Sequence, residues 1–203
     1  KSLGPGLTKG AAIDSRGWML YPSAIPAMEL KPQRFASMRK GEGDLIHGSP
    51  LVIMANSSMD LWIDQGELTN AYPQLIFSGG KDAKIGLTYA EGLYEKKPLS
   101  TTTKNGNHKG NRNEIENKYW LGRKDSLIAD GGAHTFETMT YRTFRYVRLT
   151  VKTEGEDLTL HDFKSVFTGF PFQAKASLKT NNPLITQLLD VGFRTARLCA
   201  MET

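Results

Sequence analysis

Residue types that could carry catalysis are scattered along this sequence and form few recognisable patterns. His47, His108, His134 and His161 occur singly, and none has a partner at the i, i+4 spacing of helix-borne metal ligands. Cys199 is the only cysteine, which excludes an internal disulfide or a cysteine-based zinc site within this sequence. We expect it to be a buried structural residue rather than a nucleophile, because it falls on the apolar face of an expected helix.

The sequence contains 21 acidic residues, so a pair of carboxylates for hydrolysis could be drawn in many ways. Such a pair is defined by the separation of two carboxyl groups across a cleft, which sequence spacing does not supply. We therefore nominate no catalytic residue. No phosphate-binding loop, dinucleotide fingerprint or nucleophile elbow occurs either. The sequence predicts neither a cofactor nor a metal site.

A polar segment from Asn105 to Glu116 has the length and glycine position of a calcium-binding loop. Gly110 falls at the sharp turn, and Glu116 at the bidentate position. However, Asn105 replaces the leading aspartate, and Lys109 puts a cation where an oxygen ligand belongs. An exposed polar loop is the better interpretation.

The same loop holds the best candidates for a functional contact. Arginine offers a planar fork of donors, asparagine both donates and accepts, and charged groups form the stronger hydrogen bonds to sugar hydroxyls or to a neighbouring domain. Tryptophan can stack on the apolar face of a pyranose, although core packing is the alternative for Trp18, Trp62 and Trp120 alike. A solvated connection without a ligand is the alternative for the loop. The candidate ligand-binding residues are Asn111, Arg112, Asn113, Glu114 and Trp120.

Composition indicates an ordinary globular protein. Of the 203 residues 39% are apolar, and 26 basic residues against 21 acidic ones leave a net charge of +5. Basic and acidic residues alternate and no run of five lysines or arginines occurs, so we expect no nucleic-acid partner. No apolar run approaches the ~20 residues of a membrane span, and no signal peptide is recognisable. The start at Lys1 is typical of a processed protein or of a piece of a longer one.

The elements that must position these residues fall into three units. Residues 1–44 contain four prolines and the turn 41–44, which predict an irregular strap or linker. Residues 45–180 predict a β-sandwich domain, and residues 181–203 predict a helix. Within the middle unit, we expect strands at residues 51–54, 59–63, 74–77, 83–91, 145–151, 158–160, 166–167 and 174–179.

Alternating side chains predict which face of each strand is buried. In residues 83–91 we expect Ile85, Leu87 and Tyr89 to face inward. In residues 145–151 we expect Val147, Leu149 and Val151 inward, with Tyr146, Arg148 and Thr150 outward. Many short strands with glycine-rich turns and no βαβ rhythm predict a mainly β fold, an antiparallel β-sandwich or jelly roll.

The end of the sequence changes to helical periodicity. Asn182 and Pro183 have the types preferred at an N-cap and at the first helical position. An apolar stripe follows, made of Ile185, Leu188, Leu189, Gly192, Ala196 and Cys199. Because no glycine cap or polar stop precedes Thr203, we expect a helix that the end of this sequence truncates.

Several segments together resemble one family, the bacterial α-L-rhamnosidases of glycoside hydrolase family 78. The specific parts are the Arg-Thr-Phe-Arg-Tyr strand and the Leu-Cys-Ala-x-Glu-Thr end, although the family usually has histidine where Met201 stands. The order and spacing are similar to those of the β-sandwich domain just before the catalytic barrel. The segments are residues 109–114, 130–132, 141–147, 167–172 and 194–203.

The resemblance implies an enzyme built of β-sandwiches followed by an (α/α)₆ barrel, in which two carboxylates invert configuration at the sugar. The family's catalytic motif follows the Cys-Ala-x-Glu-Thr segment, so residues 181–203 would lead toward a barrel absent from this chain. No catalytic residue is carried over, and this chain alone is expected to be inactive. The implied location is the bacterial periplasm or exterior.

Three hypotheses about function remain. The first is a non-catalytic accessory domain of a rhamnosidase-like hydrolase acting on plant or bacterial polysaccharides, with a rhamnose-containing glycan and its own barrel as partners. The second is a carbohydrate-binding module with its own sugar site. The third is an unrelated structural or adhesion sandwich, which would have no reason to run into a barrel helix.

Overall fold

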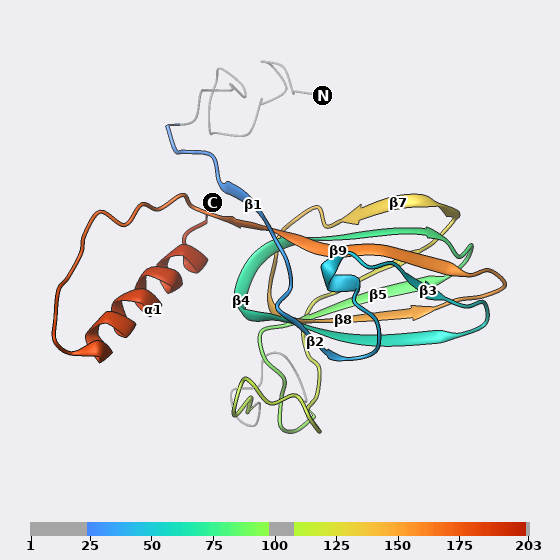
Figure 1. Cartoon of the computed structure of the whole chain (residues 1–203), viewed down its shortest axis with the longest axis horizontal. Helices are drawn as coiled ribbons and strands as arrows, with labels where there is room; N and C mark the ends of the chain where they lie inside the picture. The colour runs from blue at the N-terminus through green and yellow to red at the C-terminus, as the bar shows by residue number, and fades with distance from the viewer. Residues whose placement is uncertain (1–23, 98–107, 202–203) are drawn as a thin grey trace, which may run out of the picture.

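The computed structural model of the chain describes residues 24–97 and 108–201. They form a β structure with one α-helix beside it (Figure 1). In chain order the elements are β1 (Glu29–Gln33), β2 (Ser37–Lys40), the short 3₁₀ helix η1 (Leu45–His47), β3 (Leu51–Ile53), β4 (Ser58–Gly79), β5 (Lys84–Ala90), β6 (Lys124–Ile128), β7 (Gly131–Glu137), β8 (Arg142–Lys152), β9 (Leu158–Gly169) and α1 (Pro183–Cys199).

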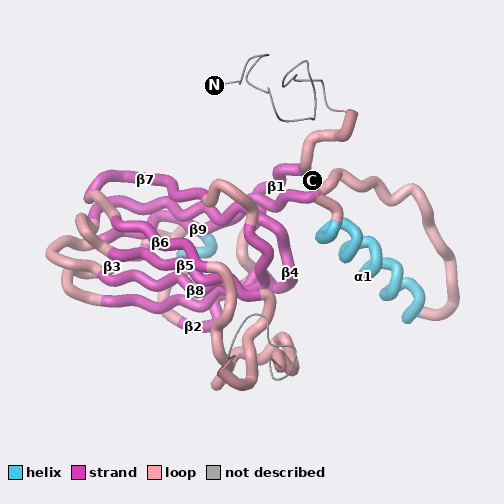
Figure 2. Tube along the Cα trace, turned by 180° about the vertical axis from the view of Figure 1, so that it is seen from behind, coloured by secondary structure: helices cyan, strands magenta, loops and turns pink. Residues whose placement is uncertain are grey.

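All strand pairings are antiparallel and join the strands into one curled sheet. The main order is β1-β9-β4-β8-β5-β6, with β2 and β7 also paired to β4 and β3 paired to β9. Strand β4 belongs to both halves of the curl: residues 58–64 and 69–71 pair with β8, and residues 71–79 pair with β9. The sheet therefore folds back on itself into two facing layers (Figures 1 and 2). The prediction of a mainly antiparallel β fold with a C-terminal helix is confirmed.

The core lies between the two layers, where alternating side chains from both meet. The predicted inward residues of β5 and β8 are all buried. From the other layer come Leu75, Phe77, Leu160 and Phe163, and the ring of Phe163 lies 4.7 Å from that of Phe35. Burial of such side chains supplies most of the driving force for folding.

Tyr146 departs from the predicted alternation, because its outward-facing side chain is also buried. The chain between β5 and β6 passes over this part of the sheet and covers it. There Tyr146 packs in a second apolar cluster with Ala90, Leu93 and Ile115. Alternation correctly placed Tyr146 on the outer face, but it did not predict the loop that shields it from water.

Several predictions about strands differ from the structure, both at the ends of the β unit and within it. Residues 29–33 and 37–40, expected within an irregular strap, pair as β1 and β2 with β9 and β4. The segments expected at 59–63 and 74–77 are parts of one long strand, β4. Residues 174–179, expected as a strand, lie exposed in a connection that pairs with no strand of residues 24–97 and 108–201. Alternation alone does not make a strand, because the backbone also needs a pairing partner.

Helix α1 begins as predicted: the Asn182 side chain accepts a hydrogen bond from the Leu184 amide at 3.0 Å, with Pro183 in the first turn. The helix ends at Cys199, and the Ala200 backbone is extended. None of its residues is buried, so the prediction of a buried Cys199 was wrong. In the described ranges, no helix is long and apolar enough to cross a membrane.

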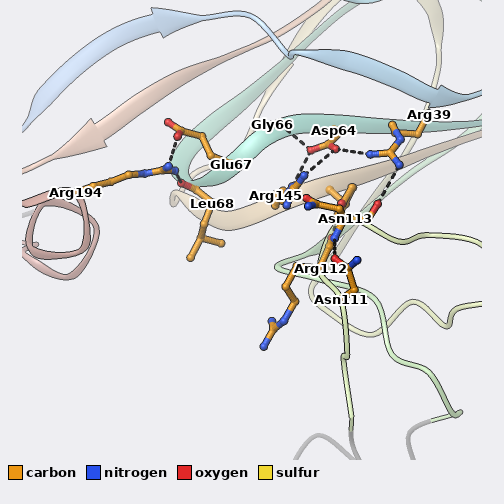
Figure 3. A network of polar contacts seen from close by, with 11 residues as sticks. Arg39, Asp64, Gly66, Glu67, Leu68, Asn111, Arg112, Asn113, Arg145 and Arg194 are labelled. Atoms are coloured by element: carbon orange, nitrogen blue, oxygen red, sulfur yellow. Dashed lines mark hydrogen bonds and ion pairs between the residues drawn. The ribbon is translucent and has the colours of Figure 1, made fainter. Parts of the chain in front are cut away.

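The bend in β4 is built around the buried carboxylate of Asp64 (Figure 3). Arg145 donates to it from Nε at 3.0 Å, and Arg39 donates at 2.9 Å. The Gly66 amide donates at 2.7 Å, and Gly66 turns the chain with a φ of 86°. Burial lowers the pKa of Arg145, but the hydrogen bond and charge of Asp64 outweigh it and raise that pKa. One carboxylate thus ties β2, β8 and both sides of the bend together.

We expect Asp64→Asn to lower the free energy of unfolding by about 3 kcal/mol, because it leaves two guanidinium groups without their shared counter-charge. Urea denaturation measures the change. Asp44→Asn is the matched control: it removes the same charge from an exposed carboxylate paired with His47, which should change stability by less than about 1 kcal/mol. Equal small losses for both variants would show that the Asp64 network does not hold the bend.

Candidate functional site

A cleft of about 670 Å³ opens where the loops after β5 and β7 meet the start of β8. We call it the loop-end cleft. Its lining combines aromatic rings, cations, a carboxylate and hydroxyl groups. The lining residues are Tyr89, Ala90, Glu91, Tyr94, Lys109, Leu121, Gly122, Arg123, Thr140, Tyr141, Arg142 and Thr143.

Backbone pairing holds the walls of the cleft. Tyr94 and Tyr119 exchange two backbone hydrogen bonds, of 3.0 and 2.8 Å, which close the loop between β5 and β6. At Gly122 the chain runs so close to β5 that a Cβ atom would lie 1.7 Å from the Tyr89 carbonyl oxygen. Only glycine allows this approach. The cleft therefore has a rigid floor on β5 and β8.

Ion pairs fix the charges on one side of the cleft. Arg142 binds Asp125 through two parallel hydrogen bonds, of 3.0 and 2.7 Å, and also donates to the Thr140 hydroxyl at 2.7 Å. Beneath it, burial and the charge of Asp125 raise the pKa of the Tyr89 phenol, which stays protonated at physiological pH. Bidentate pairs of this kind hold arginine in one orientation.

The other side of the cleft is more accessible. Lys109 pairs with Glu91 at 3.1 Å and lies 5.2 Å from the centre of the Tyr94 ring. Arg123 is exposed, and its side chain has no hydrogen bond or ion pair within residues 24–97 and 108–201. The Tyr141 ring is also partly exposed. Aromatic faces beside oriented polar groups suit a sugar ring, which presents an apolar face and a rim of hydroxyls.

The predicted site residues from Asn111 to Glu114 form a turn that bonds mainly to itself. The Asn111 side chain accepts from the Asn113 amide at 3.0 Å and donates to Glu114 at 3.0 Å. Lys118 donates to the Asn111 carbonyl at 2.8 Å. These side chains are exposed, but several of their polar groups are already engaged.

Backbone carbonyls attach this turn to the sheet. The Tyr146 hydroxyl donates to the Arg112 carbonyl at 2.6 Å, and Arg39 donates to the Asn113 carbonyl at 3.0 Å. Because Arg39 also binds Asp64, the turn is joined to the β4 bend (Figure 3). Its anchoring therefore depends on main-chain atoms.

The Arg112 side chain stays exposed and lies against Gly92, where a Cβ atom would approach its Cδ to 2.9 Å. It lines a hollow of about 430 Å³ with Tyr94, His108 and Lys109. Tyr94 and Lys109 also line the loop-end cleft, so the two hollows are neighbours. Of the four loop candidates, Arg112 alone has its side chain in this lining. Residues 105–107 of the loop lie outside the described residues.

Trp120 has a packing role. Its ring lies edge-on to that of Trp62, with ring centres 5.3 Å apart, and both pack against the cluster around Tyr146. Lys40 and Arg148 lie over the Trp62 ring, at 4.9 and 5.9 Å. The structure thus favours the packing alternative for Trp62 and Trp120. Trp18 lies outside the described residues.

Sequence reasoning missed the loop-end cleft itself, including Tyr94, Arg123, Tyr141 and Arg142. Tyr141 and Arg142 are the first residues of the segment 141–147, which carries the family resemblance. That resemblance was the sequence signal that could have pointed to them. No sequence pattern marked Tyr94 and Arg123 as members of the cleft. They come together only through the pairing of Tyr94 with Tyr119 and of β5 with β6.

The segments that carry the resemblance converge near the β4 bend. Thr143 donates to the Asn70 side chain at 2.7 Å, and Asn70 donates to the Leu198 carbonyl at the end of α1 at 2.6 Å. The Phe170 amide donates to the Ala200 carbonyl at 3.1 Å. Arg194 binds Glu67 and donates to the Leu68 carbonyl at 2.7 Å (Figure 3). These contacts join the last turn of α1 to the sheet.

Two substitutions separate the anchoring role of the loop from a contact role. Tyr146→Phe removes the hydrogen bond to the Arg112 carbonyl, and we expect it to cost about 1 kcal/mol of stability and to speed amide exchange in residues 108–116. Arg112→Ala should change stability by less than about 0.5 kcal/mol, because the side chain is exposed. Thermal melts and hydrogen exchange measure both. If Arg112→Ala were the more damaging change, the side chain would be the anchor.

No protein-family model and no curated protein sequence matches this chain significantly. Several solved structures do match this chain. A family GH78 rhamnosidase of Bacillus sp. GL1 matches 76% of the chain with a TM-score of 0.56 at 18% identity. A rhamnosidase from Klebsiella oxytoca with rhamnose bound matches 87% of the chain with a TM-score of 0.63 at 15% identity.

The chain spans only part of these proteins, 14% of the Bacillus chain and 36% of the Klebsiella chain. At such identities the matches concern the fold, and they extend over most of this chain. The resemblance noted in the sequence is thus confirmed at the level of the fold: most of this chain has the same fold as the matched parts of the two rhamnosidases.

Proposed function

We propose that this chain is the non-catalytic β-sandwich accessory domain of an α-L-rhamnosidase-like inverting glycoside hydrolase that acts on plant or bacterial polysaccharides. The observation that carries the proposal is the fold match to two rhamnosidases over most of this chain but a minor part of theirs. In such an enzyme the accessory domain would extend beyond the predicted residues 45–180 to include β1 and β2, which pair in the same sheet, and residues 181–203 would lead into the catalytic barrel. A periplasmic or extracellular bacterial location accompanies this proposal.

Helix α1 supports the proposal, because it presents an apolar stripe that the sheet leaves uncovered. Leu184, Leu188 and Val191 are 57%, 62% and 63% exposed. Ile185 and Leu189 extend the stripe. Exposed apolar surface of this kind is typical of an interface with another domain. The proposed occupant is the neighbouring barrel of the same enzyme.

The junction at the end of α1 also suits this role. Arg197 binds Glu29 of β1 and lies 4.8 Å from the centre of the Phe167 ring, while Arg194 binds the β4 bend. Burial raises the pKa of Glu29, but its hydrogen bond with Lys31 and the charge of Arg197 lower it more, so the carboxylate is ionised at neutral pH. The helix is held by its last turn through polar contacts, and its stripe is left for a partner.

The carboxylates of the sheet suit structural pairing better than acid catalysis. An inverting glycosidase needs a carboxylic acid whose raised pKa keeps it protonated. At Asp60, burial raises the pKa, but the hydrogen bond and charge of Arg148 lower it overall. Arg148 donates to both Asp60 oxygens, at 2.7 and 2.9 Å. Such a group is poorly suited to donate a proton to a leaving group.

A carbohydrate-binding module is the second candidate, favoured by the lining of the loop-end cleft. Tyr94 and Tyr141 offer faces for a pyranose, and Arg123 offers donors that have no partner among the described residues. Saturable binding of L-rhamnose or a rhamnosyl oligosaccharide to this chain, lost on Tyr141→Ala, would favour this candidate. Absence of such binding would favour the accessory role.

The accessory role predicts that the purified chain does not hydrolyse an aryl α-L-rhamnoside, even at high protein concentration. The physical reason is that the proposed acid and base belong to the barrel. A chromogenic assay with a rhamnosidase as positive control measures turnover. Turnover that copurifies with the chain and disappears when one of its own carboxylates is replaced would overturn the proposal.

The exposed stripe predicts weak self-association of the chain, since apolar surface made for another domain remains in water. Leu184→Glu with Leu188→Glu should abolish it. The matched control is Thr186→Glu with Gln187→Glu, which adds the same charge to α1 outside the stripe. Sedimentation velocity over a concentration series measures the difference. A wild-type chain that stays monomeric throughout would argue against an uncovered interface.

A further inference from the structure

A second concave surface lies on the outer face of β4, β8, β5 and β6, away from the loop-end cleft. Antiparallel register places the outward side chains of these strands in straight rows across the sheet. Figure 2 shows β6, β5 and β8 side by side. One row runs Ser58, Lys152, Lys84 and Ile128, the next runs Asp60, Thr150, Gly86 and Ser126, and the third runs Trp62, Arg148, Thr88 and Lys124.

The first two rows line a groove that runs across the strands, and no residue of the third row lines it. The groove has a volume of about 930 Å³. The Thr150 side chain lies beside Gly86, where a Cβ atom would be 2.7 Å from its hydroxyl oxygen. We call this surface the outer-face groove.

Two cations stand together on one wall of the groove. Lys84 and Lys152 are directly opposite each other on β5 and β8, and both are exposed. Neither has an ion pair within the described ranges. Like charges directly opposite one another destabilise a sheet, so the pairing contributes nothing favourable to folding. It does create a local positive field over a hollow of suitable size for a ligand.

The carboxylate in the groove does not neutralise this field. Asp60, at the end of the middle row, accepts two hydrogen bonds from Arg148 and lies 3.7 Å from Lys40. Its charge is thus compensated by two cations, neither of which lines the groove. The net charge that Lys84 and Lys152 present to the groove is left for a ligand.

We propose that the outer-face groove binds an acidic glycan chain, with uronate carboxylates on Lys84 and Lys152 and sugar rings over the Gly86 floor. An extended chain of rings fits an open groove across several strands, and carboxylate groups match the paired ammonium groups. The Ser126 hydroxyl can bond to the sugar rim, and the Thr150 hydroxyl, which donates to the Gly86 carbonyl at 3.3 Å, can accept from it. This site goes beyond the proposed accessory role and is independent of it.

The test is affinity electrophoresis and calorimetry of the chain with polygalacturonate at low ionic strength. Lys84→Gln with Lys152→Gln should weaken binding about tenfold, because two exposed charge pairs are lost. The control Lys97→Gln with Lys175→Gln removes the same charge from two exposed lysines outside the groove lining, and should change binding less than about twofold. The groove variant should melt no lower than wild type, since a repulsive pair is removed.

A second variant tests the groove rather than the charge. Ser126→Phe puts a large side chain on the floor from the exposed face of β6 and leaves every charge in place. It should weaken polygalacturonate binding at least about fivefold, with an unchanged melting temperature, because the ring would occupy the space of a sugar.

Three further polymers serve as control ligands in the binding experiment: polyglutamate, an oligonucleotide and neutral galactan. Weak binding of all three, against clear binding of polygalacturonate, supports the proposal. Equal binding of polyglutamate or the oligonucleotide would mean a general polyanion effect, and would overturn it. So would equal losses in the groove and control variants, undiminished binding by Ser126→Phe, or absence of polygalacturonate binding.

Discussion

The buried carboxylate of Asp64 is the interaction on which the rest of this structure depends. A long strand such as β4 cannot serve two layers unless it bends, and the bend exposes backbone groups that need partners. Asp64 supplies one of them by accepting from the Gly66 amide, and it draws Arg39 and Arg145 to the same point. A buried charge persists only where such donors surround it. The Asp64 carboxylate therefore fixes the position at which β4 bends and the sheet curls.

The bend organises the parts of the molecule that face outward. Through Arg39 it is joined to the carbonyl of Asn113 in the polar loop. Through Glu67, Leu68 and Asn70 it receives the last turn of α1. The contacts with the helix are polar, whereas the apolar stripe of the helix stays in water. The polar contacts thus orient α1 on the sheet, and the apolar stripe of the helix remains exposed.

Two surfaces could meet a glycan, and they are built in different ways. The loop-end cleft depends on loop packing and on the ion pair between Arg142 and Asp125, so its shape follows the loops. The outer-face groove follows from strand register alone, which sets short side chains between long ones around Gly86. The first offers tyrosine faces and hydroxyls, and the second offers two ammonium groups that have no ion pair within the described parts of the chain. The expected ligands therefore differ in charge.

The sequence by itself determined the elements whose physics is local, whereas only the tertiary structure decided the features that need distant residues. Alternation of side chains correctly placed Ile85 and Leu149 on the buried face, because a period of two residues needs no distant partner. Asn182 correctly marked the start of α1, because a helix cap is made within one turn. The continuity of β4 depends instead on partners in β8 and β9, and the burial of Tyr146 depends on a loop residue 34 positions away in sequence. Both candidate surfaces belong to this second class. Lys84 meets Lys152 only after the sheet has formed, since the sequence specifies the chemistry of each side chain but strand register sets which side chains become neighbours.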